Sequence, residues 1–345
     1  MAKEDIRIGV IGSGSVGSIV ATRLTDNGYN VEYLYDRRSE IVVGDKQQMT
    51  VIDGENSCSS LVTCVSSADG FGGKKDIIFL LGRSTNMSKH MDYVMDSLSD
   101  NGFVVMLNNT LCRRCVTARL AVNRIVGMMI GWSCIRNSDA ESEIISSGDT
   151  YVGVYTPDAV PLANLIVNMF NEFMPTKYLD NFNDVVLGRV VLNSAIACLG
   201  ALSGLRLKGF LHDKYGKRLF VELVKEGYHA YTGIGIVPVD YDGKLDYQLF
   251  CGDTLKSKRY RKAVISMLVK FNGETRSSIL LDLQNNKKAE TEYFIGKIVE
   301  TATKNHINCK FSQNVYKKIN QIEASDDTIR EELLKIVYKE CKDKW

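Results

Sequence analysis

A glycine-rich turn between a strand-like and a helix-like segment is the feature that most limits the fold of this chain. The N-terminal residues run IRIGVI, GSGSVG and SIVATRLTDNG, so Gly12, Gly14 and Gly17 form a G-x-G-x-x-G motif at the start of a helix. In this motif the first glycine permits a tight turn, the second lets a pyrophosphate approach the backbone, and the third lets helix and strand pack closely. The motif therefore predicts half of a mononucleotide-binding unit.

The same segment offers contacts to each part of a dinucleotide. The backbone N–H groups of Ser13, Ser15 and Val16 are expected to face the phosphates at the positive end of the helix. The next strand, YNVEYLYD, ends in Asp36, 24 residues after the first glycine, where a carboxylate accepts hydrogen bonds from the adenosine ribose. A carboxylate there repels the 2′-phosphate of NADP, whereas Arg37 and the following arginine can attract that phosphate or stack on adenine. We expect NAD(H) as the cofactor, with NADP(H) as the alternative. A purely structural role for Asp36, as a surface residue that caps a loop, also stays open.

Strand-like and helix-like segments alternate through residues 1–181. The expected strands continue with MTVID, DIIFLLG, GFVVMLN, RIVGMMIGWS and DTYVGVY, and the expected helices include NMSKHMDYVMDSLS and VPLANLIVNMFNEFM. Such alternation favours the α/β class, with a mostly parallel sheet that helices cover on both faces. Residues 1–181 are thus predicted to form a Rossmann-type dinucleotide-binding domain.

Residues 182–345 show long segments with apolar residues at helical spacing, including KRLFVELVKEGYHAYTGIG, ETEYFIGKIVETATKNH and DTIREELLKIVYKECKD. They predict a mainly α-helical C-terminal domain that holds the substrate and the catalytic groups. Residues 239–261 are the least regular part and are expected to form a surface excursion between helices. A chain of 345 residues is long enough for two domains, which leaves room for a ligand cleft between them.

The charge balance and the cysteine content limit the kinds of ligand and partner that the chain is expected to bind. Lysine and arginine number 43 against 41 aspartates and glutamates, without a long basic block, so neither nucleic acid nor a membrane is an expected partner. The N-terminus has no secretory pattern, and a cytoplasmic location is expected. The nine cysteines should then stay reduced. Cys112 and Cys115 form a C-x-x-C without the second half of a zinc site, so no metal is expected.

The stretch VVLGRVVLNSAIACLGAL, Val185 to Leu202, approaches membrane-spanning length. Arg189 and Asn193 at its centre would be costly in lipid, which favours a buried helix of a soluble domain. Their i, i+4 spacing places both side chains on one helix face, where a single ligand can meet them. Because an isolated buried guanidinium is expensive, a substrate carboxylate or carbonyl is a plausible partner for Arg189.

A further polar segment, SSILLDLQNNKKAETEYFIG, follows that helix. Together with GSGSVG, MLNNT and GRVVLNSAIACLGALSG, it makes the chain resemble the ketopantoate reductase family, whose members reduce 2-dehydropantoate to pantoate. The resemblance covers nearly the whole chain in the right order. Its most specific part is SS-x-x-x-D-L followed by E-x-x-Y-x-x-G.

The resemblance assigns roles to four residues that match the family. Asn108 corresponds to the asparagine near nicotinamide and substrate, and Asn193 to a substrate-contacting asparagine. Ser278 corresponds to the serine that holds the substrate carboxylate, and Glu290 to the active-site glutamate.

Other positions depart from the family. Arg189 replaces the general-acid lysine, and Ala197 replaces a second asparagine. Arg83 stands where the family commonly has a lysine near the cofactor. Where the family usually has an arginine for the NADPH phosphate, this chain has Asp36, directly followed by Arg37.

These departures leave the mechanism and substrate open. Arginine can polarise a carbonyl but is a poor proton donor, so the proton would come from water or from a protonated Glu290. The first hypothesis is an NAD(P)H-dependent reductase of a small 2-oxo acid such as 2-dehydropantoate. The second is a relative that reduces another carbonyl or an imine, and the third is an inactive nucleotide-binding protein. The sequence also does not decide between a monomer and a homodimer.

Three of the polar residues also have an alternative role that is purely structural. Asn193 could bridge helices, Ser278 could be an N-cap, and Glu290 could pair with a neighbouring lysine.

Overall fold

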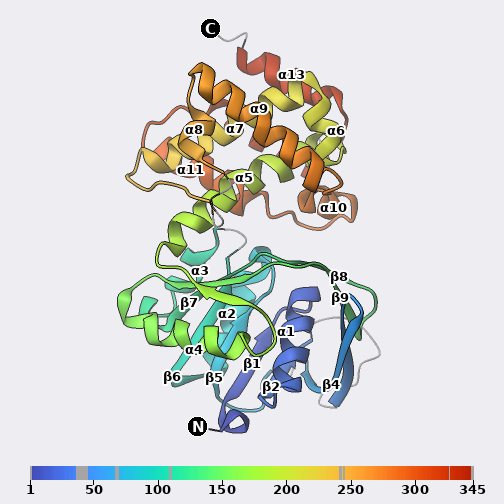
Figure 1. Ribbon diagram of the computed structural model, residues 1–345, viewed down its shortest axis with the longest axis vertical. Helices are drawn as coiled ribbons and strands as arrows, with labels where there is room; N and C mark the ends of the chain where they lie inside the picture. The colour runs from blue at the N-terminus through green and yellow to red at the C-terminus, as the bar shows by residue number, and fades with distance from the viewer. Residues whose placement is uncertain are drawn as a thin grey trace. The chain divides into compact units, whose positions relative to one another are not determined.

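The computed structural model describes residues 2–35, 46–66, 70–108, 111–240, 243, 245–325 and 327–342. The chain divides into two compact units, Met1–Asn183 and Asp184–Trp345, both drawn in Figure 1. The boundary predicted from the sequence follows residue 181, and that of the compact units follows residue 183.

The first unit combines one sheet with helices. Its strands are β1 (Arg7–Ile11), β2 (Asn30–Leu34), β3 (Lys46–Asp53), β4 (Asn56–Val65), β5 (Lys75–Leu80), β6 (Leu98–Leu107), β7 (Ile125–Ile130), β8 (Ser133–Arg136), β9 (Glu141–Ser146), β10 (Thr150–Val154) and β11 (Thr176–Tyr178). Its α-helices are α1 (Ser15–Asp26), α2 (Met87–Ser97), α3 (Arg113–Thr117) and α4 (Val160–Phe170).

The strand order is β11-β10-β7-β6-β5-β1-β2-β4-β3-β9-β8. From β7 to β4 all neighbours are parallel, and antiparallel pairs join β10 to β7, β3 to β4 and β8 to β9. The predicted α/β class with a mostly parallel sheet is confirmed. From β1 the chain turns to β2 on one side and later to β5 on the other, so the order reverses between β1 and β5. In open α/β sheets, ligands bind at the carboxyl ends of the strands beside such a reversal.

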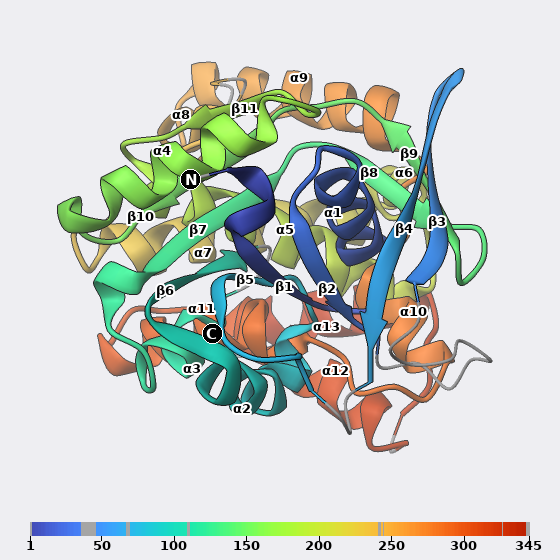
Figure 2. The same ribbon diagram turned by 90° about the horizontal axis from the view of Figure 1, so that it is seen from below.

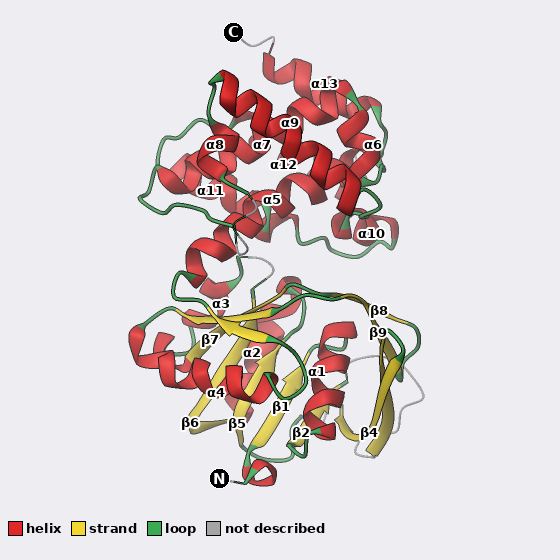
Figure 3. Ribbon diagram, viewed as in Figure 1, coloured by secondary structure: helices red, strands yellow, loops and turns green. Residues whose placement is uncertain are grey.

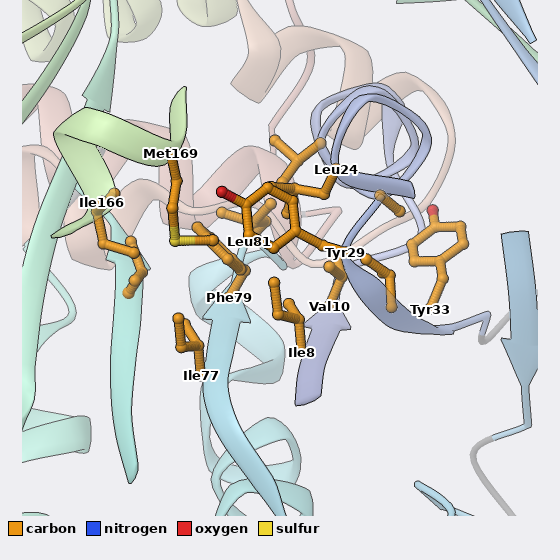
Figure 4. Packing of buried hydrophobic residues seen from close by; sticks show 14 of the residues in the cluster. Ile8, Val10, Leu24, Tyr29, Tyr33, Ile77, Phe79, Leu81, Ile166 and Met169 are labelled. Atoms are coloured by element: carbon orange, nitrogen blue, oxygen red, sulfur yellow. The ribbon is translucent and has the colours of Figure 1, made fainter. Parts of the chain in front are cut away.

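Helices cover both faces of the sheet, with α1 and α4 on one side and α2 and α3 on the other (Figure 2). Because side chains alternate along a strand, Ile8 and Val10 of β1 share a face with Phe79 of β5. Figure 4 shows these residues packing against Leu24 of α1 and against residues of α4. The ring of Phe79 lies 5.5 Å from that of Phe170 on α4, centroid to centroid. This core holds α1 and α4 on the sheet.

The antiparallel part of the sheet gives α1 a second apolar contact. Ile19 of α1 belongs to a separate buried cluster with Val51 of β3, Trp132 before β8 and Ile144 of β9. The strands β4, β8, β9 and β11 have no counterpart among the predicted strands. β4 and the β8–β9 hairpin are too polar to show a clear apolar alternation, and the hairpin joins the sheet through the distant strand β3.

In its described residues the second unit consists of helices joined by loops, with no strand (Figure 3). Its α-helices are α5 (Phe182–Ser203), α6 (Leu207–His212), α7 (Lys214–Thr232), α8 (Tyr247–Cys251), α9 (Leu255–Asn272), α10 (Ser278–Gln284), α11 (Ile295–Lys304), α12 (Lys310–Glu323) and α13 (Glu332–Lys342). By length and composition α5 could cross a membrane, but 78% of its most apolar window is buried inside the protein, as in a core helix.

The prediction of a surface excursion for residues 239–261 is wrong in its second half. That part forms α8 and the start of α9, and Tyr247, Phe250 and Cys251 are buried. The hydroxyl of Tyr247 donates to the carbonyl of Gly188 on α5 at 2.6 Å. The short α8 shows too few turns for a helical period, so its apolar residues did not reveal a helix in the sequence.

Glu226 of α7 joins two helices through a buried carboxylate. The N-terminus of α12 has no side-chain cap of its own. Instead, Glu226 accepts hydrogen bonds from the backbone N–H groups of Phe311 and Ser312 at 3.0 and 2.7 Å, and from the Ser312 hydroxyl at 2.7 Å. Burial raises the pKa of Glu226, although these three hydrogen bonds favour its charged form. The carboxylate therefore acts as the cap of α12.

We expect Glu226→Gln to lower the free energy of unfolding by about 2–3 kcal/mol, because an amide NH₂ would oppose one of the N–H donors. Urea unfolding followed by circular dichroism measures the change. Glu222→Gln, one turn earlier on α7 and partly exposed, is the control and should change stability by less than about 0.5 kcal/mol. Equal stability of the two variants would contradict the capping role.

Candidate active site

The three glycines of the loop after β1 have different surroundings. Gly12 has a φ of 131°, and an added Cβ would lie 2.6 Å from backbone atoms of Leu81 and Gly82. An added Cβ at Gly17 would lie 1.9 Å from the carbonyl oxygen of Gly12. At Gly14, by contrast, an added Cβ would meet nothing within 4 Å. The protein's own packing requires the first and third glycines, whereas the space at the second is open to a ligand.

Arg136 of β8 fixes this loop from its carbonyl side. Its guanidinium donates to the carbonyl oxygen of Ser13, and at 2.9 Å to the hydroxyl of Tyr35. Further N–H groups of Arg136 donate to the carbonyls of Ser138 and Asp139. The guanidinium is thus mostly engaged by the protein itself. No local sequence pattern marks this residue, because the contact joins segments 123 residues apart.

Ser15 and Val16 begin α1, directly after the loop. The Ser15 hydroxyl lies 3.2 Å from the thiol of Cys134, which also belongs to β8. The hydroxyl of Tyr33, at the end of β2, donates to the carbonyl of Gly12 at 3.3 Å. The β8–β9 hairpin and β2 therefore hold the loop and the start of α1 from the protein side.

Two more predicted residues follow neighbouring strands at the same carboxyl edge. Arg83 comes after β5, which pairs with β1, and Asn108 comes after β6, which pairs with β5. The fold thus brings Gly12, Arg83 and Asn108 to one edge, at the reversal of strand order. Asp36 and Arg37 lie outside the described residues.

Asn108 is only 3% exposed and has a fixed orientation. Its backbone N–H donates to the carbonyl of Met128 at 2.7 Å, and its Oδ1 accepts from the Tyr155 hydroxyl at 2.9 Å. This arrangement leaves the two Nδ2–H groups of Asn108 as donors for a ligand. Burial raises the pKa of Tyr155, so its hydroxyl remains a donor at neutral pH.

Tyr155 is itself held by aromatic and cationic neighbours. The guanidinium of Arg113 lies 4.4 Å from the centre of its ring, and the ring of Phe182 packs edge-on at 6.2 Å. Arg113 also donates to the side chain of Asn183 at 3.3 Å. Neither Arg113 nor Tyr155 is among the site residues predicted from the sequence, and the available signal was the position of Tyr155 as the last residue of the predicted strand DTYVGVY.

In the second unit, Arg189 and Asn193 both lie on α5, and both are partly buried. The helix is continuous through both residues, so they share a face as expected. Ala197 is buried one turn further along. Its carbonyl oxygen accepts a hydrogen bond from the Ser277 hydroxyl at 2.6 Å.

The two adjacent serines have different environments. Ser277 is buried and is the N-cap of α10, since its hydroxyl accepts from the N–H of Leu280 at 3.0 Å. Ser278, the first residue of α10, is exposed. An added Cβ at Gly200 of α5 would lie 2.7 Å from Cβ of Ser277, so the start of α10 lies directly against α5. The N-cap alternative for Ser278 is therefore wrong, because its neighbour is the cap.

Glu290 lies just before a short 3-10 turn, Thr291–Tyr293, and is partly buried. Next to it, the backbone N–H of Ala289 donates to the carboxylate of Glu323 at 2.7 Å, which ties this segment to α12. Within the described part of the chain, no group of three His, Cys, Asp or Glu side chains could hold a metal ion.

An α/β unit with a glycine turn at its strand-order reversal, followed by a helical unit with polar residues on an apolar helix, defines a class of nicotinamide-dependent oxidoreductases. Comparison with known families makes this specific. The family model "Ketopantoate reductase PanE/ApbA" matches residues 8–157, and "Ketopantoate reductase PanE/ApbA C terminal" matches residues 181–323. The chain belongs to the ketopantoate reductase family and is an NAD(P)-dependent oxidoreductase that acts on a CH–OH group.

Individual relatives are distant but similar over nearly their full length. The 2-dehydropantoate 2-reductase of Pyrococcus horikoshii is 22% identical over 301 residues, which cover 86% of this chain and 91% of the relative. A D-mandelate dehydrogenase solved with NADH and anilino(oxo)acetate has a TM-score of 0.77 at 14% identity, covering 94% and 100% of the two chains. A PanE/ApbA family ketopantoate reductase from Ralstonia eutropha JMP134 has a TM-score of 0.75 at 16% identity, covering 93% and 99%. At such identities the two solved structures establish a common fold.

Alanine substitutions at Gly14 and Gly17 should have different effects, one on cofactor binding and the other on stability. Gly14→Ala should leave the free energy of unfolding within about 0.5 kcal/mol of wild type but weaken NADH binding about tenfold or more, because the new methyl occupies the open approach. Gly17→Ala should lower the free energy of unfolding by more than about 3 kcal/mol, because its Cβ meets the Gly12 carbonyl. Fluorescence titration with NADH and urea unfolding measure the two effects. Unchanged NADH affinity in Gly14→Ala would contradict a pyrophosphate at this position.

Proposed function

We propose that this protein reduces 2-dehydropantoate, or a 2-oxo acid of similar size, to the corresponding 2-hydroxy acid. The observation that carries the proposal is the pair of serines at the start of α10. Ser277 anchors the helix to α5, and Ser278 is exposed beside the same helix that carries Arg189 and Asn193. Hydroxyl, amide and guanidinium groups on neighbouring elements suit a small anion that also has a carbonyl oxygen.

The first unit binds the nicotinamide dinucleotide in this proposal. The pyrophosphate lies against the glycine loop at Gly14, with the N–H groups of Ser13, Ser15 and Val16 as donors. Asn108 donates through Nδ2 to the ligand, since its Oδ1 is taken by the Tyr155 hydroxyl.

Two further contacts concern the ends of the cofactor. Arg83 supplies a positive charge near the phosphates from the end of β5. Asp36, which follows β2 in the sequence, favours the ribose hydroxyls of NADH over the 2′-phosphate of NADPH. NADH is therefore the proposed cofactor.

The second unit binds the 2-oxo acid. Ser278 donates to the substrate carboxylate, and Asn193 donates to the carboxylate or the ketone. Arg189 points its fork of N–H groups at the ketone oxygen and polarises the carbonyl. Ala197 supplies a buried apolar wall where the resembled family has an asparagine.

When bound, the nicotinamide would supply a hydride for the ketone carbon. The C=O π electrons move to oxygen, and Arg189 stabilises the resulting alkoxide. Because arginine does not give up its proton near neutrality, the alkoxide takes a proton from water or from Glu290. NAD⁺ and the 2-hydroxy acid are the products.

Replacing Arg189 tests its role directly. The wild-type protein should oxidise NADH in the presence of 2-dehydropantoate, and Arg189→Ala should lower kcat/KM by about 100-fold or more, on the order of 3 kcal/mol of transition-state stabilisation. Arg189→Lys should retain more activity than the alanine variant, since an ammonium group can both stabilise the alkoxide and donate a proton. The measurement is NADH absorbance at varied substrate concentration.

A matched control is Arg206→Ala, an exposed arginine of the same unit that pairs with Glu274, which should leave the kinetics unchanged. Full activity of Arg189→Ala would contradict the assignment of Arg189. Turnover of other 2-oxo acids but not of 2-dehydropantoate would contradict the proposed substrate. A preference for NADPH of about tenfold or more would contradict the role of Asp36.

The adjacent serines offer a test within one turn of helix. Ser278→Ala should raise KM for the 2-oxo acid about tenfold and leave the free energy of unfolding unchanged, because the side chain is exposed. Ser277→Ala should lower the free energy of unfolding by about 1–2 kcal/mol through loss of the cap. Steady-state kinetics and urea unfolding of both variants separate the roles. An unchanged KM in Ser278→Ala would remove this residue from the substrate site.

A further inference from the structure

A basic groove lies on the second unit, between α7 and α9, two helices that can be followed in Figure 1. Its volume is about 500 Å³. Two acidic side chains line it, Glu222 and Asp253. Six cationic side chains also line it: Lys217, Arg218, Lys225, Lys258, Arg261 and Lys262.

Helical spacing places these cations on facing sides of the two helices. On α9, Lys258, Arg261 and Lys262 follow the i, i+3, i+4 pattern of a single face. On α7 the groove side is opposite the buried side, where an added Cβ at Gly227 would lie 3.0 Å from Val191 of α5. The groove is therefore separate from the α5 face that carries Arg189 and Asn193.

The positive charge of the groove is mostly uncompensated by the protein. Among the described residues, the ion pair within the groove joins Lys225 to Asp253 at 2.5 Å. This contact, together with the nearby charges of Arg261 and Lys258, lowers the pKa of Asp253. Glu222 is then the remaining acidic group that faces the other cations.

Arg261 is partly buried where it lines the groove. Its Nη1 atom is shielded from solvent and has no hydrogen-bond partner among the described residues, so no carboxylate of that part of the chain holds this nitrogen. The guanidinium fork suits the oxygens of a phosphate.

We propose that the α7–α9 groove binds a small polyanion with at least two phosphate groups. The excess of cations over acids favours a ligand with more than one negative charge. The volume lies in the range of small-molecule sites, roughly 300–1,000 Å³. The cations converge on a concavity between two helices, whereas a nucleic acid would require a basic surface extended along its backbone. This site is independent of the glycine loop and of the proposed reaction.

Titration of the full-length protein with inorganic tripolyphosphate tests the proposal, by calorimetry at physiological ionic strength. The double variant Lys258→Glu, Arg261→Glu should weaken binding about tenfold or more. The matched control is Lys256→Glu, Arg259→Glu, which makes the same charge change at two exposed residues of α9 outside the groove. Screening by salt should leave its affinity within about threefold of wild type.

Lysine acetylation read by mass spectrometry gives a second measurement. Tripolyphosphate should protect Lys217, Lys258 and Lys262 but not Lys256. Equal weakening in both double variants would overturn the proposal, because it would indicate diffuse attraction. Loss of binding in Gly14→Ala with unchanged binding in the groove variant would overturn it as well, by assigning the anion to the glycine loop. So would the absence of tripolyphosphate binding, or groove-dependent binding only to duplex DNA or anionic vesicles.

Discussion

The contact between Gly17 and the carbonyl oxygen of Gly12 is the constraint on which the nucleotide unit depends. An added Cβ at Gly17 would lie 1.9 Å from that oxygen, so α1 approaches the end of β1 too closely for any side chain at this position. This approach places the start of α1 at the carboxyl edge of the sheet, next to the strands that end before Arg83 and Asn108. The core under α1 and the β8–β9 hairpin beside it then keep the helix in that position.

In the second unit, one of two adjacent serines stabilises the contact between α5 and α10, and the other is proposed to bind the substrate. The Ser277 hydroxyl donates to a backbone carbonyl of α5 and accepts from a backbone N–H of α10, whereas the side chain of Ser278 is exposed. Tyr155 has a comparable supporting role in the first unit, since it sets which atoms of Asn108 remain available. In both units a buried hydroxyl fixes a neighbouring polar group, and the neighbour is the group that is proposed to meet the ligand.

The sequence predicts those parts of the fold that depend on local patterns. The glycine motif, the alternating strands and helices, and the helical segment around Arg189 and Asn193 all have such patterns, and the structure contains them. The β8–β9 hairpin and Arg136 could not be predicted, because the hairpin joins the sheet through the distant strand β3 and Arg136 contacts Ser13, 123 residues away. Likewise, two consecutive serines are chemically identical in the sequence, and only the start of α10 shows which of them is buried.

The hydrogen bond between Arg136 and Ser13 also bears on folding. The glycine loop lies near the N-terminus, yet the group that fixes its carbonyl side comes from a hairpin that pairs at the far edge of the sheet. Without Arg136, the N-terminal residues lack the hydrogen bond that holds the Ser13 carbonyl, and contacts of such long sequence separation form slowly. The proposed dinucleotide site is therefore a property of the whole α/β unit rather than of its first βαβ segment. A bound cofactor would accordingly stabilise the unit against global unfolding, since binding favours the state in which the loop is complete.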